Sequence, residues 1–217
     1  MAGRPKLVVF DMDGTLIDGR LIEVISKKYR IFEKVVAIQS DRSLEGYKKT
    51  ELIASLLKGI KASEIVDAID SIPIMNNADK IVTWFKKNGY VTGIITDSYT
   101  IAAEVIANKL NIEFFAANEL ILEDGFLTGG IRMPLGWEKT QCSCKISICK
   151  RYHLNHYSNK YGVSIKDTIA IGDTRGDICM IKQAGLGIAF MPKDPDIIKQ
   201  SQNIISNPDL NEILNYM

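Results

Sequence analysis

The chain of 217 residues has a mass of 24.2 kDa, which corresponds to one domain, or to one domain with a modest insertion. Hydrophobic residues make up 46% of it and charged residues 24%, a mixture that is usual for a globular protein with a buried core. The 27 basic and 26 acidic residues leave a net charge of +1, which argues against a dedicated nucleic-acid-binding protein, since such proteins are usually basic.

The sequence contains no segment typical of a membrane span or an export signal. No apolar run approaches the roughly 20 residues that a transmembrane helix needs. The apolar run directly before Asp11 has only four residues, 7–10, which is too few for the core of a signal peptide. The four cysteines are spaced too unevenly for a secreted disulfide framework. We therefore expect a cytoplasmic protein.

Short apolar runs rich in valine and isoleucine predict strands that are buried on both faces. These strands are expected at residues 7–10, 91–95, 168–171 and 186–190. Helical apolar spacing occurs between them, at residues 78–88, 100–110, 146–162 and 177–184. Alternation of this kind predicts an α/β fold, a Rossmann-like parallel sheet covered by helices.

Two segments interrupt the alternation. Residues 18–75 have helical apolar spacing and no convincing strand, so we interpret them as a small helical cap inserted after the first strand. Residues 1–17 and 76–217 would then form the core. In residues 120–133, alternating apolar residues flank the pair Asp124-Gly125, which predicts a β-hairpin.

Asp11 and Asp13 follow the first predicted strand directly and precede Gly14. Open parallel sheets bind ligands beyond the carboxyl ends of their strands. Two carboxylates packed together repel each other, so we expect a cation beside them, and hard oxygen ligands favour Mg²⁺. The pair by itself also fits an ordinary turn without chemistry. Polar residues at the ends of the other strands favour the functional interpretation.

The run Asp11-Met12-Asp13-Gly14-Thr15-Leu16 resembles the first motif of the haloacid dehalogenase superfamily of phosphatases. Three further motifs follow in order: a threonine that ends a strand, a lysine, and an acidic pair after a strand. Their residues are Thr96, Lys150, Asp173 and Asp177. Residues 124–129, 184–190 and 209–214 are typical of the phosphoserine phosphatase branch. The resemblance therefore runs nearly from end to end.

The resemblance implies a Mg²⁺-dependent phosphomonoesterase that acts on a small phosphorylated metabolite. Asp11 would be the nucleophile that forms an aspartyl-phosphate, and Asp13 would be the general acid and then the general base. Asp11, the backbone carbonyl of Asp13, and Asp173 would hold the metal. Thr96 would bind phosphoryl oxygens, and Lys150 would neutralise charge in the transition state.

Some of these assignments have alternatives. Thr96 taken alone fits an ordinary β-branched strand residue. Lys139 and Lys145 compete with Lys150 for the third motif, and we favour Lys150 because its spacing to the fourth motif fits without a gap. Asp177 would hold Lys150 or a metal-bound water rather than the metal itself.

Two positions in the cap depart from the phosphoserine phosphatases. Arg20 stands where those enzymes carry a glutamate that helps to bind the substrate's ammonium group, so the charge is reversed. Arg20 is either a solvated residue of the cap linker or the partner of a second anionic group on the substrate. Ile53 aligns with an arginine that binds the substrate carboxylate. Other basic residues of the cap that are candidates to replace it are Arg42, Lys48 and Lys49.

A third departure follows the second motif, where Asp97-Ser98 replaces a Gly-Gly pair. Asp97 would either receive a cationic group of the substrate or cap the helix that starts near Tyr99. We take Arg20, Asp97 and Ser98 as candidate substrate-binding residues. The three departures disfavour phosphoserine as the substrate and leave the core chemistry intact.

A cysteine-containing segment looks like an insertion before the third motif. Cys142, Cys144, Cys149 and His153 together make a site for a soft metal conceivable. Their spacing does not follow the usual paired pattern of zinc ligands, and reduced thiols without a metal are the alternative.

Two other functions remain open. One is a phosphotransferase that passes the phosphoryl group to a small alcohol, because the run Thr96-Asp97-Ser98 resembles a homoserine phosphotransferase-like subgroup. The other is a non-catalytic ligand-binding protein on the same scaffold. In each case we expect a small-molecule ligand, no nucleic-acid or membrane partner, and a monomer or homodimer.

Overall fold

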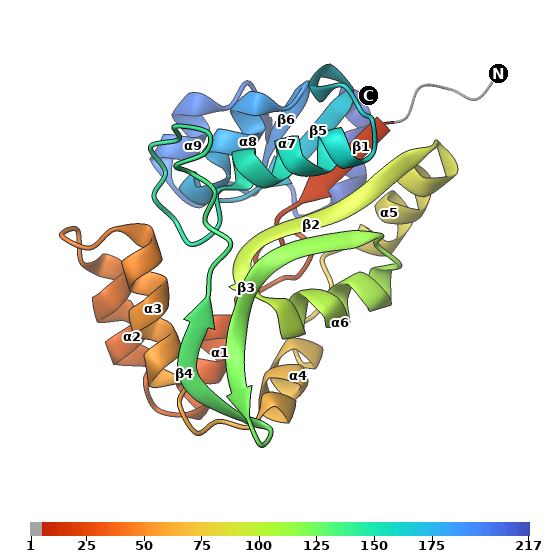
Figure 1. Ribbon diagram of the computed structural model, residues 1–217. Coiled ribbons are helices and arrows are strands. Elements are labelled where there is room, and N and C mark those ends of the chain that lie inside the picture. Colours follow the sequence, from red (N-terminus) through yellow and green to blue (C-terminus); the bar gives the residue numbers. More distant parts are fainter. Residues whose placement is uncertain (1–5) are drawn as a thin grey trace.

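The computed structural model describes residues 6–217, so the first five residues of the predicted core segment 1–17 lie outside the described residues. Within this range the strands form one sheet in the order β4-β3-β2-β1-β5-β6-β7 (Figure 1). The central strand β1 (Lys6–Phe10) lies between β2 (Tyr90–Tyr99) and β5 (Thr168–Gly172) and runs parallel to both. The predicted α/β fold with a Rossmann-like parallel sheet is confirmed.

The outer strands complete the sheet on both sides. β6 (Leu186–Phe190) and β7 (Asn203–Ile205) extend it beyond β5, and both are parallel. On the other side β3 (Phe114–Glu123) pairs with β2 in parallel and then with β4 (Phe126–Arg132) in antiparallel fashion. β3 begins before the predicted hairpin because its first half belongs to the parallel sheet. The short strand β7 lacks a distinct apolar run and was not predicted.

The turn between β3 and β4 is the expected Asp-Gly pair. Asp124 has φ +49° and Gly125 has φ +80°, so both residues are in the left-handed region. A two-residue turn with two positive φ angles matches the twist of an antiparallel pair, and Asp-Gly suits it well. The predicted hairpin is therefore present.

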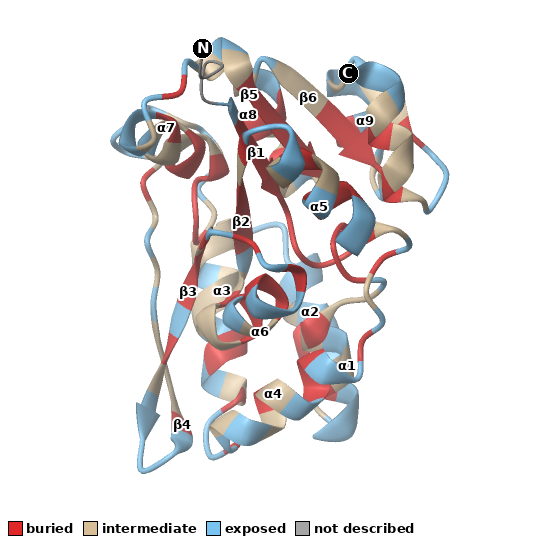
Figure 2. Ribbon diagram, turned by 90° about the vertical axis from the view of Figure 1, so that its right-hand side faces the viewer, coloured by how far each residue is buried: buried red, intermediate tan, exposed pale blue. Residues whose placement is uncertain are grey.

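Helices cover both faces of the sheet. α5 (Ala78–Lys87) and α6 (Thr100–Leu110) pack on one face, and α7 (Lys150–Lys160) and α8 (Ile178–Gln183) pack on the other. Alternate residues of β1 point to opposite faces: Val8 and Phe10 join the first core, and Leu7 and Val9 join the second. Figure 2 shows the buried strands between these helices. α9 (Pro195–Gln200) precedes β7.

Four helices lie between β1 and α5 among the described residues. They are α1 (Leu21–Lys28), α2 (Phe32–Ser40), α3 (Gly46–Leu56) and α4 (Ala62–Asp70), all within the segment predicted as the cap. In Figure 1 they lie below β1, β5 and β6, with α2 and α3 to the left of the β3–β4 hairpin and α4 to its right. Gly59 N–H donates to the Leu127 carbonyl and Leu127 N–H donates to the Ile60 carbonyl, each at 2.8 Å. These bonds attach the helical segment to the hairpin.

Two helices begin later than the sequence pattern suggests. α7 starts at Lys150 instead of 146, because residues before it are extended: Leu135 N–H donates to the Ser147 carbonyl, and Cys149 N–H donates to the Leu135 carbonyl. α8 follows a 3-10 turn, Arg175–Asp177, whose first amides are capped by Thr174. Further 3-10 turns span Ile165–Asp167 and Leu210–Tyr216.

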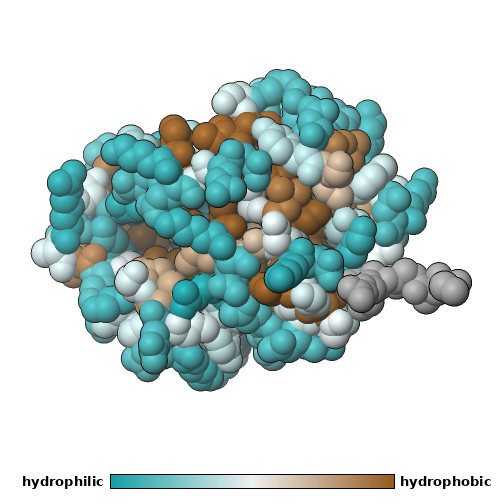
Figure 3. Space-filling view, turned by 90° about the horizontal axis from the view of Figure 1, so that it is seen from above, coloured by the Kyte–Doolittle hydropathy of each residue, from teal (hydrophilic) through white to brown (hydrophobic). Residues whose placement is uncertain are grey.

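The outer surface is mostly hydrophilic, as expected when the hydrophobic side chains are packed around the sheet. None of the helices formed by residues 6–217 has the length and apolar character needed to cross a bilayer. In Figure 3, which views the molecule from above, hydrophilic side chains cover most of the face and hydrophobic ones show as separate patches.

Candidate active site

The site residues predicted from the sequence meet at the carboxyl ends of the central strands. Asp11 follows β1, Thr96 lies late in β2, and Asp173 follows β5. All three side chains are buried. Lys150 reaches the same place from the first residue of α7, and Asp177 from the turn before α8. The parallel topology brings these residues together although the chain separates the first from the last by more than 160 positions.

Lys150 is buried between two carboxylates. Its Nζ atom lies 2.7 Å from Asp11 Oδ1 and also donates to Asp177 Oδ1. Burial alone lowers the pKa of Lys150, but Asp11 and Asp177 outweigh it and raise that pKa above its ordinary value. Lys150 therefore stays protonated. Of its rivals in the sequence, Lys139 is exposed and Lys145 pairs with Glu45 at the surface.

The two carboxylate oxygens of Asp177 have different partners. Oδ1 accepts the hydrogen bond from Lys150. The second oxygen, Oδ2, accepts hydrogen bonds from the backbone N–H of Thr174 at 3.0 Å and from the Thr174 hydroxyl at 3.1 Å. Burial raises the pKa of Asp177 to about 6, against the opposing effect of Lys150. Gly172 is required beside it, because a Cβ atom there would lie 2.2 Å from Asp177 Cγ.

Asp13 connects the core site to the helical segment. Its Oδ1 atom accepts a 2.6 Å hydrogen bond from the backbone N–H of Leu21, the first residue of α1. Burial raises the pKa of Asp13 to about 7, the Leu21 N–H opposes this, and Asp11 adds to it. A carboxyl group that titrates near neutral pH can both give and take a proton, as general acid–base catalysis requires.

Asp173 has one oxygen engaged and one free. Oδ2 lies 3.0 Å from Arg20 and 3.4 Å from Lys193, whereas the buried Oδ1 has no hydrogen-bond partner among residues 6–217. Burial raises the pKa of Asp173 to about 8, and Asp11 and Asp177 contribute. Carboxylate oxygens of Asp11, Asp173 and Asp177 all lie within 4.8 Å of one another. An unpartnered buried oxygen in such a cluster fits a divalent cation with oxygen ligands.

The substrate candidates line a pocket between the helical segment and the core. Arg20, the residue before α1, lies there with Asp13, Asp97 and Ser98. The remaining lining residues are Ile22, Gln39, Thr50, Ile53 and Tyr99. Asp97 does not cap the next helix: α6 begins at Thr100, Tyr99 is its N-cap residue, and no side chain bonds to its first amides. The capping interpretation of Asp97 is therefore wrong.

An adjoining pocket extends from Arg20 and Asp97 toward Lys49 and Arg175. Ile53 lines both pockets, so the position where the phosphoserine phosphatases carry arginine faces the site. Of the proposed replacements, Lys49 lines this second pocket. Lys48 pairs with Glu51, and Arg42 is exposed.

Lys193 was missed by the sequence reasoning. It follows β6, its Nζ atom contacts Asp173, and its backbone N–H donates to the Asp173 carbonyl at 3.0 Å. The signal was available in principle, because β6 is the next strand of the same sheet and its carboxyl end faces the same side. A lone lysine after Met191-Pro192 carries no motif, and so it was not singled out.

Comparison with known proteins agrees with this geometry. The model of the haloacid dehalogenase-like hydrolase family matches residues 8–182, which include Asp11, Thr96, Lys150, Asp173 and Asp177. The chain belongs to this family. The family assignment from the first motif is thereby confirmed.

Curated relatives place the chain near one branch of the family. A phosphoserine phosphatase of Methanocaldococcus jannaschii is 32% identical over 222 residues, with all of both chains covered. The phosphoserine phosphatase SerB2 of Mycobacterium tuberculosis is 29% identical; the match covers 96% of this chain and 49% of that protein. The predicted resemblance to the phosphoserine phosphatase branch is therefore confirmed.

Solved structures agree with both the family and the fold. A structure described as a phospho-aspartyl intermediate analogue of phosphoserine phosphatase has a TM-score of 0.84 at 30% identity, with 99% of each chain covered. A substrate-bound phosphoserine phosphatase complex has the same TM-score, identity and coverage. Similarity over nearly the whole length includes the helical segment as well as the sheet.

Proposed function

We propose that this protein is a Mg²⁺-dependent phosphomonoesterase that acts on a small phosphorylated metabolite through an aspartyl-phosphate intermediate. The observation that carries the proposal is the arrangement around Asp11. This buried carboxylate follows the central strand, contacts a buried cationic lysine at 2.7 Å, and is near Asp13, whose pKa is raised to about 7. The similarity to a structure of a phospho-aspartyl intermediate analogue supports the same chemistry.

In the first step, an oxygen of Asp11 attacks phosphorus and the bond from phosphorus to the leaving oxygen breaks. Asp13 transfers its proton to that oxygen, so the product leaves as a neutral alcohol. Lys150 orients Asp11 and offsets the growing negative charge, while Asp177 holds Lys150 in place. The Thr96 hydroxyl, whose oxygen accepts a 3.2 Å hydrogen bond from the Ser98 N–H, would donate to a phosphoryl oxygen.

In the second step, Asp13 accepts a proton from water, whose oxygen attacks phosphorus. The bond between Asp11 and phosphorus breaks, which releases phosphate and restores the carboxylate of Asp11. One carboxyl group serves both steps because its proton is lost in the first and regained in the second. The raised pKa of Asp13, about 7, allows both states near neutral pH.

Mg²⁺ would be held by Asp11, the backbone carbonyl of Asp13, and Asp173, whose Oδ1 atom is otherwise unpartnered. When bound, it supplies positive charge that offsets repulsion between an anionic nucleophile and an anionic substrate. Arg20 and Lys193 already neutralise part of the charge on Asp173, so the cluster of carboxylates is only partly compensated by the protein.

We further propose that the substrate carries a second anionic group that Arg20 binds. Arg20 and Lys49 are the basic side chains of the cap that line the two pockets, beside Glu23. Ile53 leaves no arginine at the position that the resemblance assigns to the substrate carboxylate. Asp97 and Ser98, on the core side of the pocket, would select among the other substituents.

We also propose a cytoplasmic location, since all four thiols are free and a reducing compartment keeps them so. A monomeric or homodimeric state stays a prediction.

The experiment is a phosphate-release assay with Mg²⁺ on a panel of small phosphoesters, including phosphoserine and esters with two anionic groups. Asp11→Asn serves as the control, because it keeps the shape of the side chain and removes the nucleophile. Release that requires Mg²⁺ and Asp11 supports the proposal. Release that persists in Asp11→Asn contradicts the aspartyl-phosphate mechanism.

A phosphotransferase is the second candidate, because exposed Asp97 lies beside Ser98 at the pocket, where an acceptor alcohol would enter. Small alcohols such as homoserine are added to the same assay. A phosphorylated acceptor that forms at the expense of free phosphate favours transfer over hydrolysis.

A further inference from the structure

The four cysteines of the chain lie in one cluster. Cys142 and Cys144 belong to the loop before α7, Cys149 is the residue before α7, and Cys179 is in the first turn of α8. Their Sγ atoms all lie within 4.8 Å of one another, and none of the four forms a disulfide. The sequence suggested His153 as the fourth member of the group. The structure places Cys179 there instead.

We propose that Cys142, Cys144, Cys149 and Cys179 bind one Zn²⁺ ion in a structural site. Four thiolates around one zinc at about 2.3 Å form a tetrahedron whose sulfur atoms are about 3.8 Å apart. The observed spacing needs only small side-chain movements to reach this arrangement. A cluster of several iron atoms would hold its ligands farther apart, so the geometry favours a single ion.

The surroundings of the cluster offer hydrogen-bond donors to its sulfur atoms. The backbone N–H groups of Arg151 and Tyr152, in the first turn of α7, donate to the sulfur atoms of Cys179 and Cys149, respectively. The Thr140 hydroxyl lies 3.7 Å from the Cys149 sulfur. These backbone donors at the start of α7 stabilise negative charge on the sulfur atoms. Four thiolates with one zinc leave a net negative charge that these groups offset.

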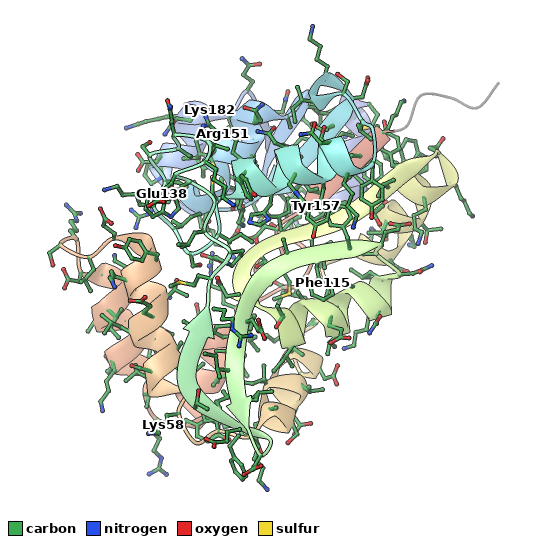
Figure 4. All side chains as sticks on the ribbon, in the orientation of Figure 1. Lys58, Phe115, Glu138, Arg151, Tyr157 and Lys182 are labelled. Carbon is green, nitrogen blue, oxygen red and sulfur yellow. The ribbon has the colours of Figure 1, made fainter. Side chains whose placement is uncertain are left out.

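The loop that carries three of the four cysteines lacks regular secondary structure. Residues 133–149 form no helix or paired strand apart from one bridge to Ile148. Connections of this length without regular structure are uncommon in compact domains. In Figure 4 the loop, marked by Glu138, lies against α7 near Arg151, whose guanidinium donates to the Thr140 carbonyl. A metal bound by residues of the loop and both helices would stabilise this region.

The proposed zinc ligands are next to candidate active-site residues along the chain. Cys149 immediately precedes Lys150, and Cys179 follows Asp177 by two positions. Lys150 and Asp177 are hydrogen-bonded to each other. One ion that binds both Cys149 and Cys179 would therefore position the beginnings of α7 and α8, and with them this charged pair. The ion would act on structure and would not contact the substrate.

The test is the metal content of the full chain, purified under reducing conditions from cells supplied with zinc. We expect close to one zinc per chain by elemental mass spectrometry. Cys179→Ser and, because Cys179 is partly buried, the loop variant Cys142→Ser should both lose most of it. His153→Ala is the matched control and should retain it. Asp173→Asn should also retain it, which separates this site from the carboxylate cluster.

Cobalt provides a second readout that does not depend on activity. Co²⁺ bound by four thiolates gives sulfur-to-metal charge-transfer absorption, which should appear in the parent protein and disappear in both cysteine variants. Four free thiols and no zinc after incubation with excess metal would overturn the proposal. So would a native disulfide within the cluster. Loss of zinc in His153→Ala with retention in Cys179→Ser would overturn the assigned ligand set.

Discussion

Lys150 shows how single residues determine the chemistry of this site. A lysine buried without partners would lose its charge, but here Asp11 and Asp177 keep it protonated. In the proposed mechanism its Nζ atom would both orient Asp11 and offset negative charge. For Asp13, in contrast, burial favours the uncharged form. It raises the pKa of Asp13 to about 7, although the backbone N–H of Leu21 opposes this.

Lys150→Met should lower kcat by about a hundredfold to a thousandfold, because it removes a preorganised cation from the transition state. It should also destabilise the fold, since it leaves Asp11 and Asp177 buried without their common partner. Steady-state kinetics and urea unfolding measure the two effects. Lys139→Met is the matched control at an exposed lysine and should change neither quantity. A large kinetic effect in Lys139→Met alone would reassign the third motif.

Asp13→Asn should lower turnover by about a hundredfold to ten-thousandfold, because it removes the proton donor and acceptor. With an ester whose leaving group needs no proton, the first step should survive while the second stays slow. Phosphorylated protein should therefore accumulate and be trapped by acid quenching. If the second step stays as fast as in the parent protein, Asp13 is not the base.

Arg20→Glu should change the order of substrates. It introduces the charge that the resemblance assigns to this position in the phosphoserine phosphatases, and it removes a cation from the pocket. We expect kcat/KM to fall at least about tenfold for esters with a second anionic group, and to fall less or rise for phosphoserine. Arg20→Lys is the comparison that keeps the charge.

An equal loss of kcat/KM for all esters would contradict a role of Arg20 in substrate selection. Arg20 would then act only through its contact with Asp173 or with the phosphoryl group that all the esters share.

At the scale of elements, the junctions between helices and strands are held by polar contacts at their ends. Glu113 follows α6 and accepts hydrogen bonds from the backbone N–H and the hydroxyl of Thr92 in β2. It also pairs with Lys86 of α5 at 3.1 Å. One carboxylate therefore joins three elements at the end of the sheet opposite the candidate active site.

Glu113→Gln should reduce stability in a pH-dependent way. Burial raises the pKa of Glu113, but the bonds from Thr92 and the contact with Lys86 outweigh it and lower that pKa below the ordinary 4.5. The folded state therefore binds a proton less readily than the unfolded state, and the ionised group stabilises the fold above that pH. The stability difference between parent and variant should shrink as pH falls below about 4.5. Unfolding curves at several pH values measure this, with Glu123→Gln as an exposed control. A difference that does not vary with pH would contradict it.

At the scale of the whole molecule, the helical segment and the core meet at the site itself. Asp13 accepts a bond from Leu21, and Arg20 pairs with Asp173, so the residues before and at the start of α1 contact catalytic candidates directly. The helical segment is also attached by backbone pairing with the β3–β4 hairpin and by the ion pair between Asp70 of α4 and Lys109 of α6. A change of charge on Asp13 or Asp173 therefore alters contacts of both the core and the helical segment.

Mg²⁺ should raise the Tm of the parent protein, because it binds the folded carboxylate cluster and not the unfolded chain. At a hundredfold excess over Kd the stabilisation is about 2.7 kcal/mol. Asp173→Asn should lose the Mg²⁺-dependent shift, whereas the exposed Asp196→Asn should keep it. Thermal scans with and without Mg²⁺ decide. An undiminished shift in Asp173→Asn would place the cation elsewhere.

The sequence by itself determined the features that depend on short stretches of chain. Apolar runs marked the buried strands, Asp124-Gly125 marked the hairpin, and the spacing in 18–75 marked the helices inserted after β1. The motif residues could be proposed as partners because parallel strands end at one edge of a sheet, so that Asp11 and Asp173 were expected at the same edge. That β1 and β5 are adjacent strands came from the structure.

The tertiary structure alone decided the relations between residues far apart in the chain. Cys179 joins the other cysteines and Lys193 reaches Asp173, although neither belongs to a local pattern. Asp97 faces the pocket rather than a helix end because β2 continues to Tyr99 and α6 starts later. Periodicity reports which face of an element is buried, but it carries no information on which side chain of another element will meet that face. That pairing depends on how helices and loops pack together.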